Sequence, residues 1–383
     1  MTRNIQKSLT LAVVAISAVI CLSASRPRFG SGQVQQTDAL SRWHSRDYGG
    51  IKYVGSAKCA ECHGYQASTQ LNTPMAHALE TADQCQALST NEKLTFRNGP
   101  YSYEIARQGN RPVYTVSNGD TAISEPIIYC FGLGSVGQTY LFQHNGSLYE
   151  SRVSYYRTIQ KLDFTGGHLH LPPGSLDEAL GRRVGAGEAL ECFGCHAPNS
   201  VSGSELRLDH LTPGITCESC HGPGERHIVA VKAGKLKDLQ IFNPGKIGPN
   251  ELSQEFCGSC HRSFDQAMML PRQGGLNNLR FQPYRIFNSR GHNKPDARIS
   301  CIACHDPHQQ IVREPAFYDG RCLACHLSSV AETGTAKRSA PACPVAKQQC
   351  VTCHMPKVEV PEMHFKFTDH WIRVAKPGEP APN

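Results

Sequence analysis

A short motif that occurs seven times constrains this chain more than any other feature of its sequence. In each copy two cysteines are separated by two residues, and a histidine directly follows the second cysteine. Fourteen of the 18 cysteines belong to these copies, an arrangement that ordinary disulfide pairing does not explain. In chain order, motifs 1 to 7 are Cys59/Cys62/His63, Cys192/Cys195/His196, Cys217/Cys220/His221, Cys257/Cys260/His261, Cys301/Cys304/His305, Cys322/Cys325/His326 and Cys350/Cys353/His354.

The repeated motif is the attachment sequence of c-type haem. The two cysteines form thioether bonds to the porphyrin, and the histidine lies on the same turn, where its imidazole reaches the iron. Zinc sites also use Cys-x-x-Cys pairs, but they do not require a histidine at one fixed offset. Thioredoxin-like redox pairs do not require it either. The sequence therefore predicts seven covalently bound c-type haems, attached by the 14 motif cysteines and ligated by the seven motif histidines.

The spacing of the motifs limits the fold. Six of them lie between residues 192 and 354, and such short intervals cannot each hold a conventional domain. We expect a mainly α and loop-rich multihaem cytochrome c fold built around stacked haems, with a small antiparallel β insertion. The expected divisions are a signal peptide at 1–25, an N-terminal segment with the first haem at 26–90, a β-rich insertion at 91–160, a six-haem core at 161–370 and a Pro-rich tail at 371–383.

The β insertion is predicted from alternation. From Leu94 to Tyr156 apolar and polar residues alternate, and turn pairs such as Asn98-Gly99 and Asn145-Gly146 separate the runs. The stretch GLGSVG at 132–137 has the spacing of a dinucleotide-binding loop, but we expect a strand after it and not a helix. We therefore expect no nucleotide.

The N-terminus resembles an export signal. Arg3 and Lys7 precede an apolar run from Leu9 to Leu22, and small residues follow up to Ser25. The run is short for a membrane span, which needs about 20 apolar residues. The predicted outcome is cleavage near Ser25 and export, with the periplasm as the expected location. An uncleaved N-terminal anchor is the alternative, and it is the only membrane association that we expect.

The formal charge of +7 invites a nucleic-acid interpretation, which we reject. Two of the positive charges lie in the predicted signal peptide. Each haem would add two propionates against one charge on its ferric core, which offsets the remaining excess internally. The lysines and arginines are better explained as propionate partners and solvated surface.

A second axial histidine saturates a haem iron for electron transfer, whereas an open position permits substrate binding. The predicted distal ligands are His77, His168, His227, His292, His308, His364 and His370. His170 competes with His168, and His210 competes with His292. The remaining two histidines outside the motifs, His44 and His144, are expected to bind no iron.

His308 is assigned to a different haem from the one that His305 holds. Three residues cannot wrap around a porphyrin, and Pro307 ends the turn and favours an extended conformation at Asp306. Outside the motifs, Cys85, Cys130 and Cys343 remain in the expected mature chain. A Cys85–Cys130 disulfide is one alternative for them, and an odd number leaves one unpaired.

Several longer strings resemble the exported multihaem cytochrome c family, with kinship to the tetrahaem cytochrome of ammonia oxidation and to haem-bearing cytochromes fused to tetratricopeptide repeats. They are YVGSAKCAECHGYQ at 53–66, TCESCHGPGERH at 216–227, CIACHDPH at 301–308, CVTCHMPK at 350–357 and FTDHWI at 367–372. The resemblance implies that His77, His227, His308 and His370 serve as distal ligands. No tetratricopeptide repeat follows the last string. The Cys-x-x-Cys-Lys motif of pentahaem nitrite reductases is also missing from the sequence.

The expected function is electron transfer without catalytic residues of its own. Low-potential bis-histidine haems would pass electrons between redox proteins such as a quinol-oxidising complex, a terminal reductase or other cytochromes. The alternative is a multihaem reductase or oxidase that acts on a small nitrogen or sulfur compound at one five-coordinate haem. The sequence leaves the donor, the acceptor and the oligomeric state open.

Overall fold

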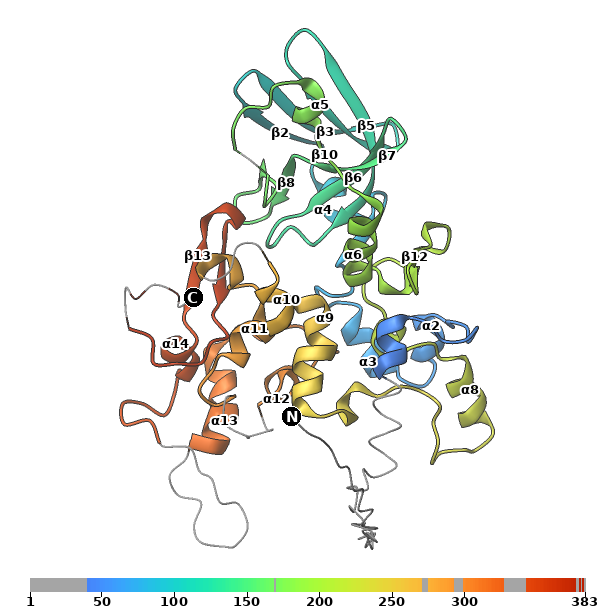
Figure 1. The fold of residues 1–383 in the computed structure, drawn as a ribbon, viewed down its shortest axis with the longest axis vertical. Helices are drawn as coiled ribbons and strands as arrows, with labels where there is room; N and C mark the ends of the chain where they lie inside the picture. The colour runs from blue at the N-terminus through green and yellow to red at the C-terminus, as the bar shows by residue number, and fades with distance from the viewer. Residues whose placement is uncertain are drawn as a thin grey trace, which may run out of the picture.

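The computed structural model describes residues 40–168, 170–270, 275–292, 299–326 and 342–376, together with residues 379 and 381. The predicted signal peptide, residues 1–25, lies outside the described residues. A large antiparallel sheet forms one end of the molecule, and short helices that carry the motifs form the other (Figure 1). Among the described helices, none has the length and apolar character needed to cross a bilayer.

The sheet has eight strands, and every pairing in it is antiparallel. Seven follow the order β10-β7-β6-β5-β4-β3-β2, and β1 pairs with the end of β5 on the edge opposite β6. The strands are β1 (Leu79–Thr81), β2 (Lys93–Asn98), β3 (Tyr101–Gln108), β4 (Arg111–Ser117), β5 (Ala122–Phe131), β6 (Thr139–His144), β7 (Ser147–Ser151) and β10 (Gly181–Arg183). Three separate two-stranded hairpins are β8 (Val153–Tyr156) with β9 (Lys161–Phe164), β11 (Val201–Ser202) with β12 (Glu205–Leu206), and β13 (Lys357–Val360) with β14 (Phe365–Thr368).

The strands of the sheet form because buried aromatic and aliphatic residues alternate with more exposed residues along them. Along β3, Tyr101, Tyr103 and Ile105 are buried while the residues between them are more exposed. Tyr114 on β4 packs on Phe142 on β6 with ring centroids 5.3 Å apart. Large apolar side chains on a half-buried pleated surface favour strands, and their burial stabilises the sheet. The sheet therefore encloses its own aromatic core.

Two buried thiols meet inside this core. Cys85 and Cys130 are both fully buried and form a hydrogen bond with each other, and Cys85 also donates to Oε1 of Gln138 at 3.0 Å. Both are free thiols in the structure. Burial raises the pKa of Cys130, whereas the hydrogen bond from Cys130 lowers the pKa of Cys85. Cys343 lies outside the sheet and is partly exposed.

The expectation of a mainly α fold with a small β insertion is wrong. The sheet is a major part of the structure. It includes β1, which precedes the alternating segment in the sequence, and β10, which follows it. Each of these strands has three residues, too few to show an alternating pattern in the sequence. They form because the neighbouring strands offer unpaired backbone groups, as in the pairing of Leu79 with Phe131 and of Gly181 with Ser151.

The helices of the other half are short. They include α2 (Ser56–Ala60), α3 (Gly64–Gln70), α6 (Ala186–His196), α7 (Cys217–His221), α8 (Glu225–Lys232), a π-helical segment η4 (Glu251–Cys257), α9 (Gly258–His261), α10 (Phe264–Met268), α11 (Gln282–Phe287), α12 (Cys301–Cys304), α13 (Pro315–His326) and α14 (Cys350–His354). Two further helices, α4 (Gln86–Thr90) and α5 (Leu176–Leu180), lie beside the sheet (Figure 1). In five motifs a helix ends at the motif histidine. These helices are α6, α7, α9, α13 and α14.

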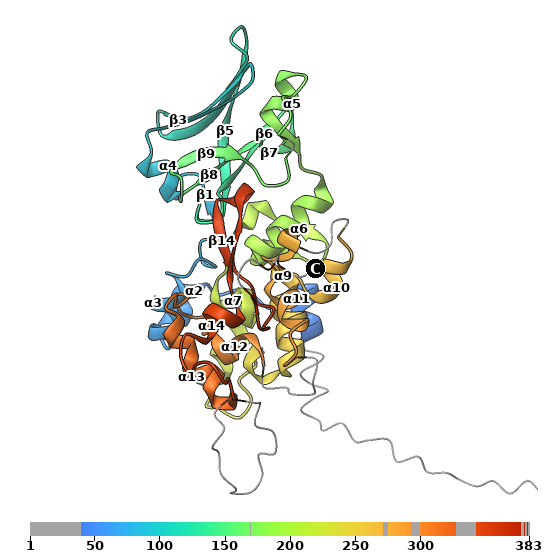
Figure 2. The same ribbon diagram turned by 90° about the vertical axis from the view of Figure 1, so that its left-hand side faces the viewer.

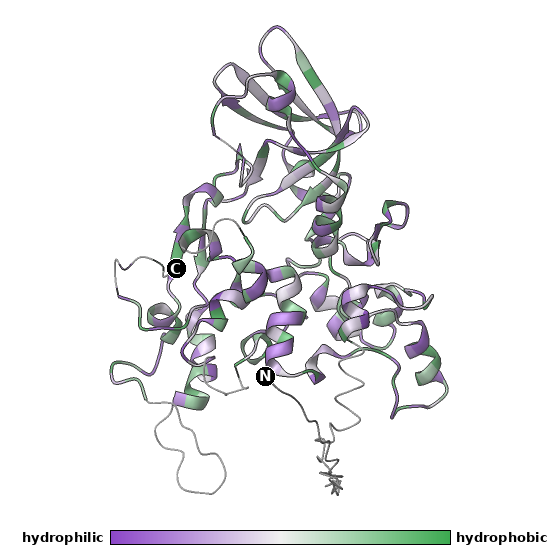
Figure 3. Ribbon diagram, in the orientation of Figure 1, coloured by the Kyte–Doolittle hydropathy of each residue, from purple (hydrophilic) through white to green (hydrophobic). Residues whose placement is uncertain are grey.

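The C-terminal hairpin connects the two halves. Val360 on β13 and Phe367 on β14 are buried in a cluster with Leu279 and with Val136, which precedes β6. Figure 2 shows β14 reaching from the helices toward the sheet. Apolar and polar residues are interleaved along both the strands and the short helices (Figure 3). The C-terminal hairpin therefore packs the two halves together through this apolar cluster.

Replacing Gly181 by Ala should destabilise the sheet edge. Gly181 has φ +149°, and a Cβ there would collide with the carbonyl oxygen of Glu150 in the paired strand β7. We expect a loss of about 2–3 kcal/mol in the free energy of unfolding, typical of strain at a special backbone position. Chemical denaturation followed by circular dichroism in the far ultraviolet measures it. Gly187→Ala on α6 is the control, because open space surrounds Gly187 and alanine favours the helix. Equal midpoints for the Gly181 variant and the wild type would contradict the close approach.

Candidate haem-binding sites

The motif side chains lie in the helical half and keep part of their surface accessible. None of the 14 motif cysteines or seven motif histidines is buried by accessible surface. Desolvation nevertheless lowers the pKa of His196, His221, His261 and His305 below the usual value for histidine. Side chains that are enclosed by protein but not packed against it border spaces that a flat prosthetic group can fill. Enclosure also keeps these imidazoles neutral, which is the form that binds metal.

Five imidazoles are held with Nε2 available for a metal. In each of them Nδ1 lies within hydrogen-bond distance of a backbone carbonyl, which can only accept a proton, so Nδ1 carries the hydrogen and Nε2 keeps its lone pair. The pairs are His196 with Ala78 (2.7 Å), His221 with Phe242 (3.0 Å), His227 with Leu239 (2.7 Å), His354 with Arg373 (2.9 Å) and His370 with Thr368 (3.0 Å). Three of the five belong to motifs, and His227 and His370 are predicted distal ligands.

Three motif histidines face a second imidazole across a gap. The ring centroids are 6.3 Å apart for His63 and His227, 6.1 Å for His221 and His308, and 6.3 Å for His305 and His370. Two imidazoles that bind one metal ion from opposite sides, each at about 2.0–2.1 Å, place their centroids roughly 6.3 Å apart. The spacing in all three pairs therefore fits one ion between the rings. The residues present suit a haem iron with two axial histidines.

His308 lies opposite His221, and His305 lies opposite His370. The short segment from His305 to His308 thus contributes to two different imidazole pairs. Asp306 orients the second ring, since its Oδ1 accepts the backbone N–H of His308 at 2.9 Å and lies 3.1 Å from Nδ1 of the same residue. Two imidazole pairs are thereby connected through one short segment of the chain.

The other four predicted distal histidines have different contacts. Nδ1 of His77 lies 2.8 Å from Oε1 of Glu80, and its Nε2 lies 3.1 Å from the Leu71 carbonyl. Nε2 of His168 lies 3.1 Å from Glu150, and Nε2 of His364 lies 2.8 Å from Asp163. The His292 ring packs on Phe287 with centroids 5.0 Å apart. The structure therefore brings three predicted distal histidines to a motif imidazole and places these four against other groups.

The histidines that were set aside or held as competitors also have defined neighbours. His170 stacks on Phe164 with ring centroids 4.6 Å apart, and Nε2 of His210 lies 3.1 Å from its neighbour Asp209. His144 lies 2.7 Å from Glu125, and His44 packs edge-on against Trp43.

The helices of the motifs contact one another, although not always in chain order. The helices of motifs 1 and 3 (α2, α7), 2 and 4 (α6, α9), 5 and 6 (α12, α13) and 6 and 7 (α13, α14) pack together, and η4 of motif 4 packs on α12 of motif 5. Thiols of different motifs lie close enough to interact at four of these contacts: Cys59 with Cys217, Cys195 with Cys260, Cys257 with Cys301 and Cys322 with Cys350. Motif 4 therefore touches both motif 2 and motif 5.

Three predicted attachment cysteines differ from the thiols that meet across motifs. Cys62 of motif 1 and Cys353 of motif 7 are exposed, and Cys325 of motif 6 is partly exposed. Each is the second cysteine of its motif, and in all three motifs it is the first cysteine that approaches a thiol of a neighbouring motif. The sequence motif does not distinguish its two cysteines. In motifs 1, 6 and 7, however, only the first cysteine lies against a thiol of a neighbouring motif. Haem attachment at Cys62, Cys325 and Cys353 stays a prediction, as it does at the other 11 motif cysteines.

Trp43 links motif 3 to motif 4. Its Nε1 donates to the carbonyl of Ser219 inside motif 3 at 2.9 Å, and its ring lies 4.3 Å from the ring of Phe256, the residue before motif 4. Arg46 donates to the same carbonyl at 2.9 Å and covers the Trp43 ring. Sequence reasoning missed both residues, because nothing in the local pattern indicates a contact with motifs so far along the chain. With this link, contacts join all seven motifs in one network that branches at motif 4.

A buried ion pair holds the segment that carries His370. Nε and Nη2 of Arg285 donate to the two carboxylate oxygens of Asp369 at 2.8 Å each, and both side chains are fully buried. Arg373 adds a third bond to Asp369 at 2.7 Å, and Trp371 packs over the Arg285 guanidinium. A paired, bidentate charge of this kind is rigid, and breaking it leaves a costly buried charge. Asp369 thereby fixes the backbone next to His370.

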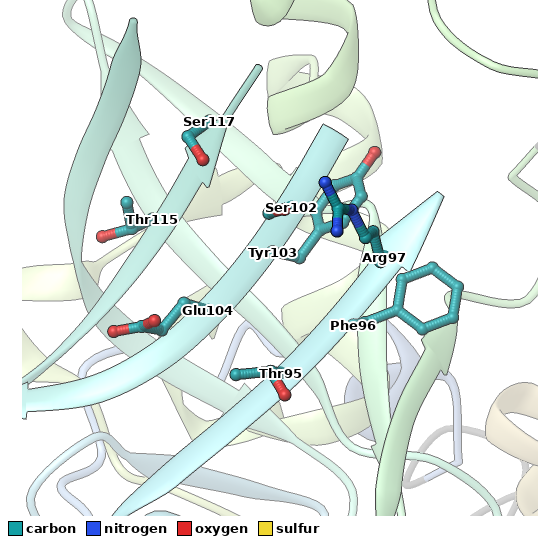
Figure 4. A pocket seen from close by; sticks show the side chains of 8 residues that line it. All are labelled: Thr95, Phe96, Arg97, Ser102, Tyr103, Glu104, Thr115 and Ser117. Carbon is teal, nitrogen blue, oxygen red and sulfur yellow. The ribbon is translucent and has the colours of Figure 1, made fainter. Parts of the chain in front are cut away.

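The sheet supports motif 2. Phe193 on α6 packs edge-on against Tyr129 and Phe131 of β5, with centroids 5.3 and 5.4 Å apart. The His196 ring lies 4.9 Å from Phe131. An open hollow on the polar face of β2–β4 lies elsewhere and is lined by Thr95, Phe96, Arg97, Ser102, Tyr103, Glu104, Thr115 and Ser117 (Figure 4). No predicted site residue lines this hollow, so it is not a candidate haem site.

Comparison with known proteins finds haem proteins. The family model for cytochrome c554 and c-prime matches residues 176–222, which contain motifs 2 and 3. The multiheme cytochrome MtrA of Shewanella baltica (strain OS185) is 24% identical over 203 residues, which are 49% of this chain and 53% of that protein. The chain therefore spans about half the length of this relative. Among solved structures, the outer cell wall cytochrome OcwA has 15% sequence identity and a TM-score of 0.48 and covers 86% of this chain and 82% of its own.

The family match includes two complete attachment motifs, and the MtrA relative is itself named as a multihaem protein. These matches, together with the repeated attachment motif, support assignment of the chain to the multihaem c-type cytochromes.

Proposed function

We propose that this protein is an exported heptahaem cytochrome that carries electrons between redox proteins. The observation that carries the proposal is the connected network of contacts that joins all seven motifs. Bound haem supplies an iron that takes up and releases single electrons. The chain contributes covalent attachment through the motif cysteines and fixed spacing through the packed motif helices. Spacing this close lets electrons pass between neighbouring sites within the protein.

The proposed ligation is bis-histidine at all, or all but one, of the irons. The pairs His63/His227, His221/His308 and His305/His370 support it by their spacing of 6.1–6.3 Å. His77, His168, His292 and His364 remain the proposed distal ligands for the other sites. For His168 and His364, metal binding requires Nε2 to leave the carboxylates of Glu150 and Asp163. Saturated irons of this kind suit electron transfer at low potential.

The proposed location is outside the cytoplasm, in the periplasm, on the basis of the signal-like N-terminus. The proposed partners are other redox proteins: a quinol-oxidising complex, a terminal reductase or other cytochromes. Closer kinship to the tetrahaem cytochrome of ammonia oxidation and to the repeat-fused cytochromes also remains a proposal.

A second candidate function is reduction or oxidation of a small nitrogen or sulfur compound. A polar cluster near motif 4 favours it. Nε2 of His364 lies 2.8 Å from Asp163, and its ring packs edge-on against Tyr156 at 4.9 Å. Arg280 interacts electrostatically with Tyr156 and with Arg262, and burial lowers the pKa of Arg280. Cations beside a phenol and a histidine can bind an anion and move a proton, although the same arginines can pair with propionates.

The mature protein should carry seven covalent haems, one for each motif. Intact mass spectrometry of the exported protein checks this, because thioether bonds survive denaturation. Mutation of both cysteines of motif 7, Cys350 and Cys353, to Ala should remove one haem and is the matched control. A mass with bound zinc, or with fewer than six haems, would overturn the proposed cofactor content.

Replacing His308 by Ala should convert one haem, the one attached at Cys217 and Cys220, from low spin to high spin. The reason is that the His308 ring lies opposite His221 and not His305. Electron paramagnetic resonance of the oxidised protein measures the change, and intact mass should show an unchanged haem count. His210→Ala is the control, because His210 is exposed and lies against Asp209. An unaltered spin-state spectrum for the His308 variant would contradict the assignment.

Electron transfer and catalysis predict different responses to small ligands. Saturated irons should bind cyanide, nitrite or hydroxylamine only slowly, and reduction should extend over a broad range of low potential. Mixing the oxidised protein with each ligand and following the Soret band measures binding. Rapid stoichiometric binding at one haem, lost in Arg280→Met and accompanied by substrate turnover, would favour the second function.

A further inference from the structure

Glu218 occupies a variable position inside motif 3 and is 2% exposed. Its carboxylate accepts three backbone N–H groups: those of Val54 at 2.9 Å, Gly55 at 2.8 Å and Gly224 at 2.7 Å. Gly55 is the residue that precedes α2, the helix of motif 1, and Gly224 follows the end of α7. One side chain therefore ties the entrance of motif 1 to motif 3.

The contacts of Glu218 have an electrostatic consequence. Backbone N–H donors stabilise the ionised form of a carboxylate. A negative charge is therefore held in the interior between two attachment motifs, where the surrounding protein screens it much less than water does. The two imidazole pairs His63/His227 and His221/His308 both start from these motifs.

The same arrangement recurs between motifs 6 and 7. Asp319 lies on α13 three residues before Cys322 and is 8% exposed. Its carboxylate accepts the N–H groups of Gln349 at 2.8 Å and Cys350 at 2.9 Å, where α14 of motif 7 begins. At two separate places in the chain, a buried carboxylate in or near one motif thus orders the start of another motif helix.

We propose that Glu218 is a positioning residue that fixes motif 1 against motif 3, and that its buried charge lowers the reduction potential of the haems attached there. The proposal deepens the proposed function and rests on haem attachment at these two motifs. A fixed negative charge opposes the addition of an electron to a nearby iron. The three N–H contacts hold the two motif helices, and with them the proximal His63 and His221, in one relative position.

Two substitutions separate the charge from the positioning. Glu218→Gln keeps the size of the side chain and removes the charge, so the midpoint potentials of the haems at motifs 1 and 3 should shift to more positive values. Glu218→Asp keeps the charge but is shorter and loses at least one N–H contact, so it should alter the magnetic interaction between these two haems. Glu225→Gln is the control, since Glu225 accepts the Lys52 N–H at 3.1 Å at an exposed position, where solvent screens its charge.

Potentiometric titration followed by electron paramagnetic resonance measures both effects, and intact mass gives the haem count of each variant. Full haem content with midpoint potentials and signals unchanged in both Glu218 variants would overturn this inference alone. A wild-type protein without haem at motif 1 or motif 3 would overturn the proposed function as well. If Glu218→Gln does not fold, Glu218→Asp decides the positioning role: wild-type signals contradict it, and altered signals support it.

Discussion

The distance between facing imidazole rings is the constraint on which the helical half depends. The proposed axial pairs have ring centroids 6.1–6.3 Å apart, and ligation of one iron by both rings requires each to turn a ring nitrogen toward the gap. Short helices cannot impose this alone, because a helix of four or five residues is marginal without tertiary packing. Backbone carbonyls that accept from Nδ1, and buried carboxylates that accept from backbone N–H groups, hold the rings and helices instead.

These polar contacts lie where an apolar core would otherwise be expected. Asp369 is bound by Arg285 and Arg373 beside His370, and Glu218 gathers three N–H groups around motif 3. The apolar clusters of the helical half, such as Ala267 with Phe281 and Tyr284, are small. Directional bonds then supply the rigidity that close packing supplies in the sheet, where Tyr114 and Phe142 fill the interior.

The two halves have different roles in this arrangement. The sheet forms an aromatic body that supports motif 2 through Phe193 and Phe131, and the hairpin β13–β14 ties the C-terminal motifs to it. The helical half places the seven motifs in mutual contact, with motif 4 touching motifs 2 and 5. Contact of this extent suits electron transfer through the whole molecule. The cluster around Tyr156, Arg280 and His364 is the place to which the second candidate function is assigned.

The sequence by itself determined the local chemistry: Cys-x-x-Cys-His places both attachment thiols and one imidazole on a single turn, so each motif could be identified without a structure. Alternation likewise indicated the central strands between Leu94 and Tyr156. Tertiary structure decided the rest. The pairing of His63 with His227, the recruitment of β1 and β10, and the contacts of Glu218 and Asp369 join residues far apart in the chain. Such contacts depend on how the short elements pack, and no periodic pattern in the sequence records that packing.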